Sequence, residues 1–445
     1  MGVTAAGGWT NWAGNQRATG IQVVHPRGTG EIADAVTRAA AQGHGIRPIG
    51  SGHSFTAIGR PRDVQLRLDR HDRLLAVDRE SGLVTVESGM PLHRLNQLLD
   101  AEGLALTNLG DIDRQTVAGA VSTGTHGTGE AFGGLATQLR ALELVTAAGQ
   151  VLACSADENA DLFEHARLGL GALGVLSSVT LQTVPSFALH AHEYPAPLDE
   201  TLARFDELSA GHDHVEFYWF PHTRATNVKV NTRVPVEAGL APLSRLRGWW
   251  DDDFLSNTVF GGLVATGRRV PAVVRPAARV AAAALGSREF TDVSHRVFVT
   301  PRRVRFVEME YAVPRDALLP LLTELVAAVE ASDWRIAVPV EVRTAAADDI
   351  GLSTASGRDT GYVAIHVPPG SPDQAAYLST LERLAAQVGG RPHWGKLHSL
   401  TASELRALYP RFDDFVALRD RLDPTGVLAN DHLDLLLGPP PETSG

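Results

Sequence analysis

A short glycine-rich stretch, Gly50-Ser-Gly-His-Ser-Phe55, constrains the fold more than any other part of the sequence. It follows an apolar segment, Ile46–Ile49, which itself comes after a helical run that ends near Gly43. Two glycines in a tight turn allow positive φ angles and let main-chain N–H groups approach a ligand closely. Such a concavity suits a pyrophosphate, and His53 at its edge offers an imidazole nitrogen as a nucleophile or ligand. Taken alone, the stretch is equally consistent with a surface turn that carries a histidine.

Length and charge narrow the class of protein. A chain of 445 residues exceeds the usual size of a single core, so we predict two domains. Hydrophobic residues make up 44%, which is typical of a globular protein, and the net charge of -11 argues against a nucleic-acid partner. The single cysteine, Cys154, excludes internal disulfides and multi-cysteine metal sites. We therefore expect a protein of the reducing cytoplasm.

No stretch has the properties of a signal peptide or of a membrane span. Residues 1–12 lack a basic region and a long apolar region. The most apolar stretch, Val270–Leu285, is too short to cross a bilayer and is interrupted by Arg275 and Arg279. We predict an amphipathic or half-buried helix there, and no integral membrane segment.

The first half of the chain alternates short strands with helices, and a glycine-rich passage interrupts the alternation. Residues 107–129 contain five glycines, which fit poorly with regular core structure and well with a main chain wrapped around a flat ligand. Thr29 is a candidate N-cap for the first helix. The hydrophobic patterns predict strands at 20–24, 46–49, 64–68, 74–77, 83–86, 140–146, 151–153 and 175–184, and helices at 31–41, 91–101 and 161–168.

The hexapeptide Gly169-Leu-Gly-Ala-Leu-Gly174 matches the dinucleotide fingerprint G-x-G-x-x-G. A Rossmann site needs a strand before the glycines and a helix after them. Here a predicted helix precedes the glycines, and a run rich in β-formers follows them. We therefore predict that this segment is not a nicotinamide Rossmann site.

A domain boundary is predicted at Pro185, after which a second set of elements begins. The stretch 233–290 is irregular and charged at first and then helical. The patterns predict a helix at 318–331 and strands at 214–220, from 298 onwards, at 335–343 and at 361–367.

The predicted strand 335–343 places two charged side chains on one face. Because strand side chains alternate, Glu341 and Arg343 point the same way, about 7 Å apart along the strand. Carboxylate oxygens accept from hydroxyl groups and a guanidinium donates to oxygens, so the pair could bind a polyol. Taken alone, an ion pair on a half-exposed sheet is the simpler interpretation.

Two later segments carry further polar side chains. In 361–367, His366 faces opposite to Val363 and Ile365. If 392–398 were extended, Trp394, Lys396 and His398 would share a face, and Lys396 could polarise or deprotonate a hydroxyl group. His393 and His398 are five residues apart, which suits neither one helix face nor one strand face, so no metal site is predicted.

Five motifs occur in a fixed order and together resemble a known family. They are Gly50–Phe55, Gly124-Thr-His-Gly-Thr-Gly129, Leu170–Val175, Glu341-Val-Arg343 and His393-Trp-Gly-Lys396. In this order they resemble the sugar-1,4-lactone oxidases and dehydrogenases of the vanillyl-alcohol-oxidase flavoprotein superfamily. The resemblance extends over residues 9–437.

The resemblance implies an α+β fold with FAD as cofactor. It implies a PCMH-type FAD-binding domain at 14–185, a mixed α/β cap domain at 186–400 that forms the substrate site, and a segment at 401–438 that returns to the flavin domain. His53 matches the family histidine that bonds covalently to the flavin. The implied FAD-binding residues are Ile49, Gly50, Ser51, Gly52, His53, Ser54, Gly110, Asp111, Gly119, Ser122, Gly124, Thr125, His126, Gly127, Gly174 and Val175.

The resemblance also implies a reaction. Glu341, Arg343 and Lys396 would line the substrate pocket, and hydride would pass from C2 of a sugar-1,4-lactone (L-gulono-, L-galactono- or D-arabinono-) to flavin N5. Lys396 or a neighbour would take the hydroxyl proton, and Arg343 would stabilise the developing alkoxide. Either oxygen or another redox partner would take the electrons. Gly119 would favour an oxidase if it leaves a gap at the flavin edge, whereas Ala118 or Ala120 in that place would favour a dehydrogenase.

Three alternatives remain open at the level of sequence. An alditol oxidase acting at C1 of xylitol or sorbitol shares every motif, although the hydroxyl residue that such enzymes carry is absent near Pro368, which favours a lactone. An NADPH-dependent reductase on the same flavin domain would leave Glu341, Arg343 and Lys396 unexplained. A flavin-carrying or sugar-binding protein without turnover would make little use of a covalent redox cofactor.

Overall fold

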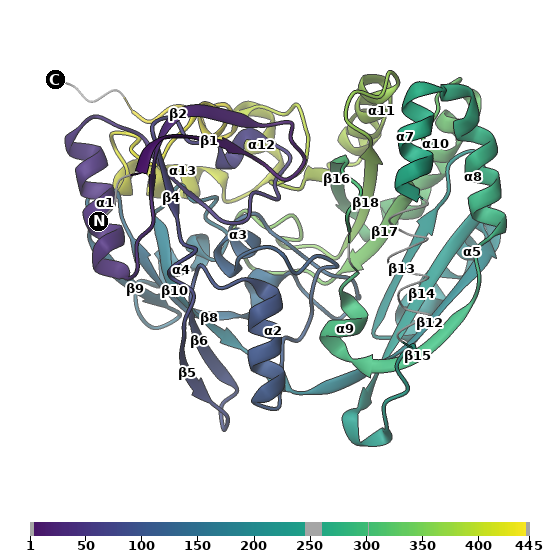
Figure 1. Ribbon diagram of the computed structural model, residues 1–445, viewed down its shortest axis with the longest axis horizontal. Helices are drawn as coiled ribbons and strands as arrows, with labels where there is room; N and C mark the ends of the chain where they lie inside the picture. The colour runs from purple at the N-terminus through teal and green to yellow at the C-terminus, as the bar shows by residue number, and fades with distance from the viewer. Residues whose placement is uncertain (1–3, 245–259, 301, 442–445) are drawn as a thin grey trace.

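A computed structural model describes residues 4–244, 260–300 and 302–441 of the chain (Figure 1). The N-terminal elements and the C-terminal helices occupy one side of the molecule in this view, and a large sheet with its covering helices occupies the other. The mixture of helices and sheets confirms the predicted α+β class.

The N-terminal part contains a four-stranded sheet and a five-stranded antiparallel sheet. The four-stranded sheet has the order β1 (Thr4–Thr10), β2 (Arg17–Val24), β4 (Val64–Arg67), β3 (Ile46–Ile49). The five-stranded sheet has the order β5 (Leu74–Asp78), β6 (Leu83–Glu87), β10 (Val175–Gln182), β8 (Leu139–Val145), β9 (Val151–Ser155). The helices here are α1 (Thr29–Ala41), α2 (Leu92–Ala101), α3 (Val117–Ser122) and α4 (Ala160–Ala166), and a short pair, β7 (Leu104–Ala105) and β11 (Val184–Pro185), leads out of this part.

Two details of this part differ from the sequence prediction. The glycine-rich passage 107–129 contains the six-residue helix α3, whose cap Thr116 accepts a hydrogen bond from the Gly119 N–H. Thr29 does not cap α1, because Gly28 occupies the N-cap position and the Thr29 hydroxyl bonds the side chains of Glu143 and Ser177 instead.

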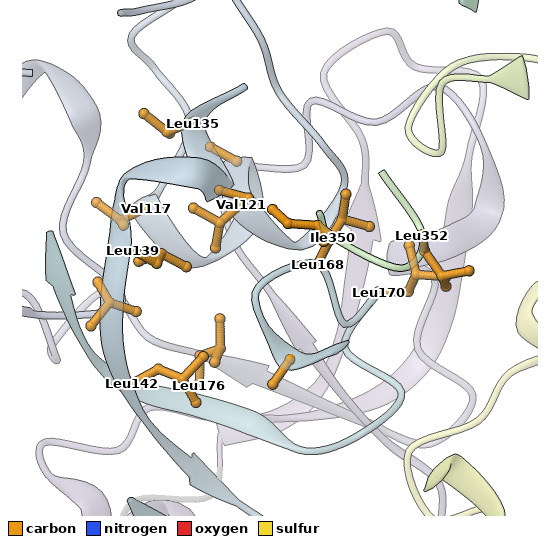
Figure 2. Packing of buried hydrophobic residues seen from close by; sticks show 14 of the residues in the cluster. Val117, Val121, Leu135, Leu139, Leu142, Leu168, Leu170, Leu176, Ile350 and Leu352 are labelled. Atoms are coloured by element: carbon orange, nitrogen blue, oxygen red, sulfur yellow. The ribbon is translucent and has the colours of Figure 1, made fainter. Parts of the chain in front are cut away.

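The core of this part is continuous with residues from the second half of the chain. Figure 2 shows Val117 and Val121 of α3 packed with Leu142 of β8, Leu176 of β10 and other apolar side chains, and with Ile350 and Leu352 nearby. Burial of these apolar side chains is the dominant stabilising contribution. It fixes α3 against the five-stranded sheet.

The second half of the chain forms one eight-stranded antiparallel sheet. Its order is β15 (Arg288–Val293), β12 (Phe187–Pro197), β14 (Ala225–Pro235), β13 (His214–Trp219), β17 (Val340–Ala345), β18 (Thr360–Val367), β16 (Val307–Pro314), β19 (Arg391–Pro392). The helices of this half are α5 (Leu198–Gly211), α7 (Phe260–Arg269), α8 (Val274–Ala283), α9 (Ser294–Phe298), α10 (Leu318–Ala331) and α11 (Gln374–Gln387).

The two faces of this sheet have opposite chemistry because side chains alternate along each strand. One face carries residues such as Phe217, Val340 and Ile365, which form a core with α5, α10 and α11. The other face carries charged residues, among them Glu216 on β13 and Glu341 on β17. This charged face contributes the protein's second pocket.

Two predicted strands are shorter than expected. Residues 336–338 are not part of β17, because the Ile336 N–H donates to His222 Nε2 (3.0 Å) and Pro339 has no N–H for a ladder. Residues 393–396 form a turn, in which the Lys396 N–H donates to the His393 carbonyl (2.9 Å). The segment 392–398 is therefore not extended, and the shared face that an extended segment would have had does not form.

The C-terminal helices pack against the N-terminal part. α12 (Ala402–Leu408), α13 (Phe412–Leu422) and α14 (Asp431–Leu437) share a core with the α2 and α3 region. Asn430 caps α14 and donates its Nδ2 hydrogens to main-chain carbonyls between Ala57 and Arg60. We propose the same three structural units as the sequence suggested (14–185, 186–400 and 401–438), because this packing joins the last segment to the first.

No helix in the described ranges is both long and apolar enough to cross a bilayer. In the stretch Val270–Leu285, only Val274–Ala283 forms an α-helix, and Val280 there is 70% exposed. The prediction of a partly buried helix in this stretch is confirmed.

Candidate active site

A cleft crosses the N-terminal part between β3, α3 and the segment 169–176. The walls meet closely because glycines stand at their contacts. A Cβ on Gly50 would lie 2.3 Å from Thr116 Oγ1, and one on Gly174 would lie 2.6 Å from Leu144 Cγ. These glycines let main chain from β3 and from the segment 169–174 come close to whatever the cleft binds.

The turn after β3 supplies free donors to this cleft. In the described part of the chain, the N–H groups of Ser51, Gly52 and His53 donate to no protein acceptor. Gly52 has φ +70°, and the buried Thr56 hydroxyl in the same wall has no partner among the described residues. Clustered main-chain N–H groups of this kind bind anions, so the cleft fits the pyrophosphate of FAD.

Arg47 on β3 fixes the opposite wall of the cleft, although no motif in the sequence pointed to it. Its buried guanidinium donates to the carbonyls of Leu170, Gly171, Ile58 and Leu428. Burial, the largest influence, lowers its pKa to about 10, so it stays charged at neutral pH. One side chain thus ties the Gly169–Gly174 segment and the C-terminal segment to β3.

His53 stands where this cleft meets a second pocket, and it lines both. Its ring stacks on Trp12 with centroids 5.6 Å apart and planes 23° apart. Burial first, and then the charges of Lys396 and Arg114, lower the pKa of His53 to about 4. At neutral pH the imidazole is therefore uncharged and has a nitrogen lone pair available for a bond to carbon.

The second pocket is bounded by the charged face of the eight-stranded sheet. Three carboxylates and two cations line it. The lining residues are Trp12, His53, Ser54, Phe55, Gly110, Asp111, Ile112, Gln115, Thr123, Thr125, His126, Glu308, Glu310, Arg343, His393, Gly395 and Lys396.

Arg343 lies at the centre of a buried charge network. Its guanidinium contacts Glu341 at bonding distance, Glu216 (Nε–Oε2 2.8 Å) and Asp111 (Nη2–Oδ2 3.5 Å). The Tyr218 hydroxyl also donates to Glu341. Glu341 and Arg343 are only 4% and 6% exposed, so the interpretation as a surface ion pair is wrong.

The carboxyl groups of this network differ in their proton affinity. Burial is the largest influence on Glu341 and raises its pKa to about 7; Asp111 adds to this increase and Arg343 opposes it. Burial also opposes the charge of Asp111, but Arg302 and Arg343 outweigh it and hold the pKa of Asp111 well below its usual value. At neutral pH, Glu341 can therefore exchange a proton, whereas Asp111 stays ionised.

Lys396 enters the pocket from the turn 393–396 and lies between two carboxylates of β16. Its ammonium contacts Glu308 at bonding distance, and its Nζ is 3.9 Å from Glu310 Oε2. Burial lowers the pKa of Lys396, but Glu308 and Glu310 together outweigh burial and raise it. Trp394 lies elsewhere: its indole N–H donates to the Leu352 carbonyl and its ring stacks on Tyr409, so the predicted shared face does not exist.

The structure brings most of the sequence-predicted residues to these two hollows. The first cleft is lined by Ile49, Gly50, Ser51, Gly52, His53, Ser54, Gly119, Ser122, Gly174 and Val175. The second pocket is lined by Gly110, Asp111, Thr125, His126, Arg343 and Lys396. Three others stand behind these walls: Gly124, with φ +80°; Gly127, whose Cβ would lie 2.2 Å from the Leu109 carbonyl; and Glu341, which meets the pocket through Arg343.

Sequence reasoning missed the charged residues that hold this site together. No chemical role was predicted for the strands or segments that carry them. These residues are Glu216, Tyr218, Arg302, Glu308 and Glu310. The alternation Glu308-Met-Glu310 places both carboxylates on one strand face, and this pattern could have identified them.

Comparison with known proteins adds to this geometry. A family model described as D-arabinono-1,4-lactone oxidase matches residues 179–436, and an FAD binding domain model matches residues 20–155. The chain belongs to the D-arabinono-1,4-lactone oxidase family. It is an FAD-dependent oxidoreductase that acts on CH–OH groups. The resemblance drawn from the five motifs is confirmed.

Curated relatives match almost the whole chain. L-gulono-1,4-lactone dehydrogenase of Mycobacterium tuberculosis is 42% identical over 434 residues, covering 97% of this chain and 99% of the relative. L-gulonolactone oxidase of Mus musculus is 35% identical over 430 residues (95% and 97%). Alditol oxidase of a Streptomyces species is 34% identical over 442 residues (96% and 99%).

Solved structures show the same fold. A solvent-stable cholesterol oxidase superposes with a TM-score of 0.83 at 19% identity, covering 98% of each chain. A cholesterol oxidase from Brevibacterium sterolicum has the same TM-score at 18% identity, covering 98% of this chain and 97% of the other. The predicted two-part arrangement of a PCMH-type flavin-binding domain with a cap is confirmed at the level of the fold.

Proposed function

We propose that the protein oxidises a sugar-1,4-lactone, such as L-gulono-, L-galactono- or D-arabinono-1,4-lactone, at C2. The observation that carries this proposal is the junction of two hollows at His53: a cleft with free N–H donors that fits FAD, and a pocket walled by paired charges that fits a polyhydroxylated ring. FAD bound in the cleft would accept the hydride. The 42% identical relative named for a gulono-lactone supports this substrate class.

We further propose a division of labour among the three predicted catalytic residues. The raised pKa of Lys396 keeps it an ammonium, so it donates hydrogen bonds to substrate oxygens and does not act as the base. Arg343 lines the pocket as a second fixed donor and stabilises negative charge that develops on the reacting oxygen. Glu341, with a pKa of about 7, stands behind the pocket wall and is bonded to Arg343, so it takes the hydroxyl proton through one bridging water and not by direct contact.

His53 is proposed to hold the flavin covalently. It follows directly on the anion-binding turn, and its uncharged imidazole retains the lone pair that a bond to the flavin requires. Cys154, the single thiol, is buried in the core with Leu142 and Leu144 and cannot serve instead.

The second candidate substrate is an alditol oxidised at C1. It is supported by the 34% identity to an alditol oxidase and by a pocket whose donors and acceptors suit any polyol. Anaerobic mixing of the purified protein with a substrate panel decides between the two. We expect gulono-, galactono- and arabinono-lactone to bleach the flavin much faster than xylitol or sorbitol does. The reverse order would reject the lactone proposal in favour of the alditol one.

A further inference from the structure

Strand β16 carries two buried carboxylates on the face that lines the second pocket. Glu308 and Glu310 are two residues apart, so their side chains point the same way, and they are 4% and 3% exposed. Both line the pocket and both lie near Lys396. One ammonium needs only one close carboxylate partner, so the second carboxylate is available for a different contact.

The contacts divide the two roles. Glu308 is the close partner of Lys396 and fixes the position of its ammonium. Glu310 lies farther from Lys396, at 3.9 Å, and its other oxygen, Oε1, is held 3.3 Å from His126 Nε2. Burial opposes the charge of Glu310, but His126 and Lys396 outweigh it and hold the pKa of this carboxyl well below its usual value. Glu310 is therefore an ionised acceptor in the pocket wall.

His126 is itself held in one orientation. Its ring stacks on Tyr362, with centroids 3.7 Å apart and planes 21° apart. Its Nδ1 lies 2.9 Å from the Gly127 carbonyl oxygen, and because a carbonyl only accepts, Nδ1 carries a hydrogen. Nε2 is thus the nitrogen that faces Glu310, and it attracts this carboxylate only when it carries a hydrogen as well, that is, when the ring is an imidazolium. A buried ring with fixed orientation then positions the carboxylate.

A metal centre is the obvious alternative, since ligand atoms of His126, Glu310 and His393 lie within 4.8 Å of one another. The hydrogen bonds of His393 argue against it. Its Nδ1 accepts from the Gly395 N–H (3.1 Å), and burial lowers its pKa to about 3, so the ring is neutral with its hydrogen on Nε2. Neither nitrogen of His393 then has a free lone pair for a metal, and the contact that remains is the ion pair of His126 with Glu310.

We propose that Glu310 accepts a hydrogen bond from a hydroxyl group of the bound substrate other than the one oxidised, and that His126 positions it for this contact. An ionised carboxylate has about four acceptor sites, and His126 and Lys396 use only part of this capacity. The matching ligand group is a neutral donor, which a polyhydroxylated lactone or alditol supplies. Glu310 would therefore select for a hydroxyl at one particular carbon. This inference rests on the proposed function.

The test couples deletion of the side chain to deletion of a substrate hydroxyl group. Native enzyme is assayed with L-gulono-1,4-lactone and with deoxy analogues, each of which lacks one hydroxyl group other than that at C2. One analogue should lose roughly ten- to a hundredfold in kcat/KM, the usual size for a hydrogen bond to a charged group. In Glu310→Ala the same analogue should lose less than about threefold relative to the full lactone. His126→Ala should weaken this selectivity in the same direction, and KM should change more than kcat.

Two control variants separate selectivity from general damage. Glu308→Gln should slow all substrates to a similar extent, because it disturbs Lys396 and leaves the Glu310 contact in place. Glu289→Gln, on β15 with a side chain that is 63% exposed, should change nothing. If Glu310→Ala does not fold with flavin bound, Glu310→Asp keeps the charge and withdraws the carboxylate by one methylene, and the same loss of selectivity is expected.

The outcomes also separate this inference from the proposed function. If the native enzyme reduces its flavin with no lactone and no alditol, the proposed function fails and this inference fails with it. If the enzyme turns over the lactone but Glu310→Ala and Glu310→Asp discriminate against the deoxy analogues as the native enzyme does, only the role of Glu310 is overturned.

Discussion

Replacing Glu341 by glutamine tests the central step of the proposed reaction. The change keeps the shape of the side chain and removes the group that is proposed to take the hydroxyl proton. Burial raises the pKa of Glu341 from its usual 4.5 to about 7, a shift worth about 3 kcal/mol between its two protonation states. A base must be deprotonated to act, so kcat/KM should rise with pH and level off above an apparent pKa near 7.

The magnitude follows from the role. A positioned general base usually contributes a factor of about 10² to 10⁴, so flavin reduction in Glu341→Gln should be slower by at least about a hundredfold above pH 7. The rate that remains should no longer rise through pH 7. The assay is anaerobic stopped-flow reduction of the bound flavin by L-gulono-1,4-lactone, measured from about pH 5.5 to about pH 9.

The same variant gives a readout that is independent of catalysis. A carboxyl group whose pKa is raised on folding contributes stability that is present below its unfolded pKa and lost as pH rises to its folded pKa. The free energy of unfolding of the native protein should therefore fall by up to about 3 kcal/mol between pH 4.5 and pH 7 through Glu341, and Glu341→Gln should lack this fall. Glu87→Gln, which removes a buried carboxylate that is paired with Arg73 and lines neither pocket, is the matched control. If the Glu341→Gln enzyme keeps the native rate of flavin reduction, and that rate still rises through pH 7, the assignment of Glu341 as the base is refuted.

Other expectations test the cofactor, the donors and the electron acceptor. The denatured native protein should fluoresce in a gel under ultraviolet light and the His53→Ala protein should not; a dark native band after full flavin loading rules out the covalent bond. Arg343→Ala and Lys396→Ala should leave the bound-flavin spectrum nearly unchanged and slow flavin reduction about a hundredfold or more, and a variant with native rates has no role in the chemistry. Reduced enzyme mixed with aerated buffer should reoxidise quickly if Gly119 opens the flavin edge, and Ala118→Gly should not accelerate it; slow reoxidation with fast dye turnover would indicate a dehydrogenase.

The structure narrows that last question. Ala118 and Gly119 both line the first cleft, whereas Ala120 lies on the buried side of α3. Of the three positions, we therefore expect Ala118 or Gly119 to border the flavin. An oxidase is expected if Gly119, which lacks a side chain, lies at the flavin edge.

Hydrophobic patterns in the sequence predicted helices and strands well where no residue distant in sequence alters the segment. The strand Ile46–Ile49 and the helix Leu318–Ala331 were predicted with the bounds that the structure has. The prediction failed where a residue distant in sequence takes a main-chain group. The predicted strand 335–343 loses its first half because His222 accepts the Ile336 N–H. No periodicity within that segment could have shown this.

For the candidate site, the sequence could predict only which side chains share a face of a strand. Alternation places Glu341 and Arg343 on one face, but it does not show that this face is buried or that Glu216 from a neighbouring strand completes the contact. Isolated, each of these charges would be costly to bury. Each is instead paired: Arg343 with Glu341 and Glu216, and Lys396 with Glu308.

This pairing explains why the wall can be both buried and reactive. Removing one partner leaves the other charge buried without compensation, so the charges hold one another in position. Burial raises the pKa of Glu341 to about 7; Asp111 and Glu216 add to this increase, and Arg343 and Arg302 oppose it. The network thus fixes the donors Arg343 and Lys396 as cations and leaves one carboxyl group free to gain or lose a proton, which is the combination that oxidation of an alcohol requires.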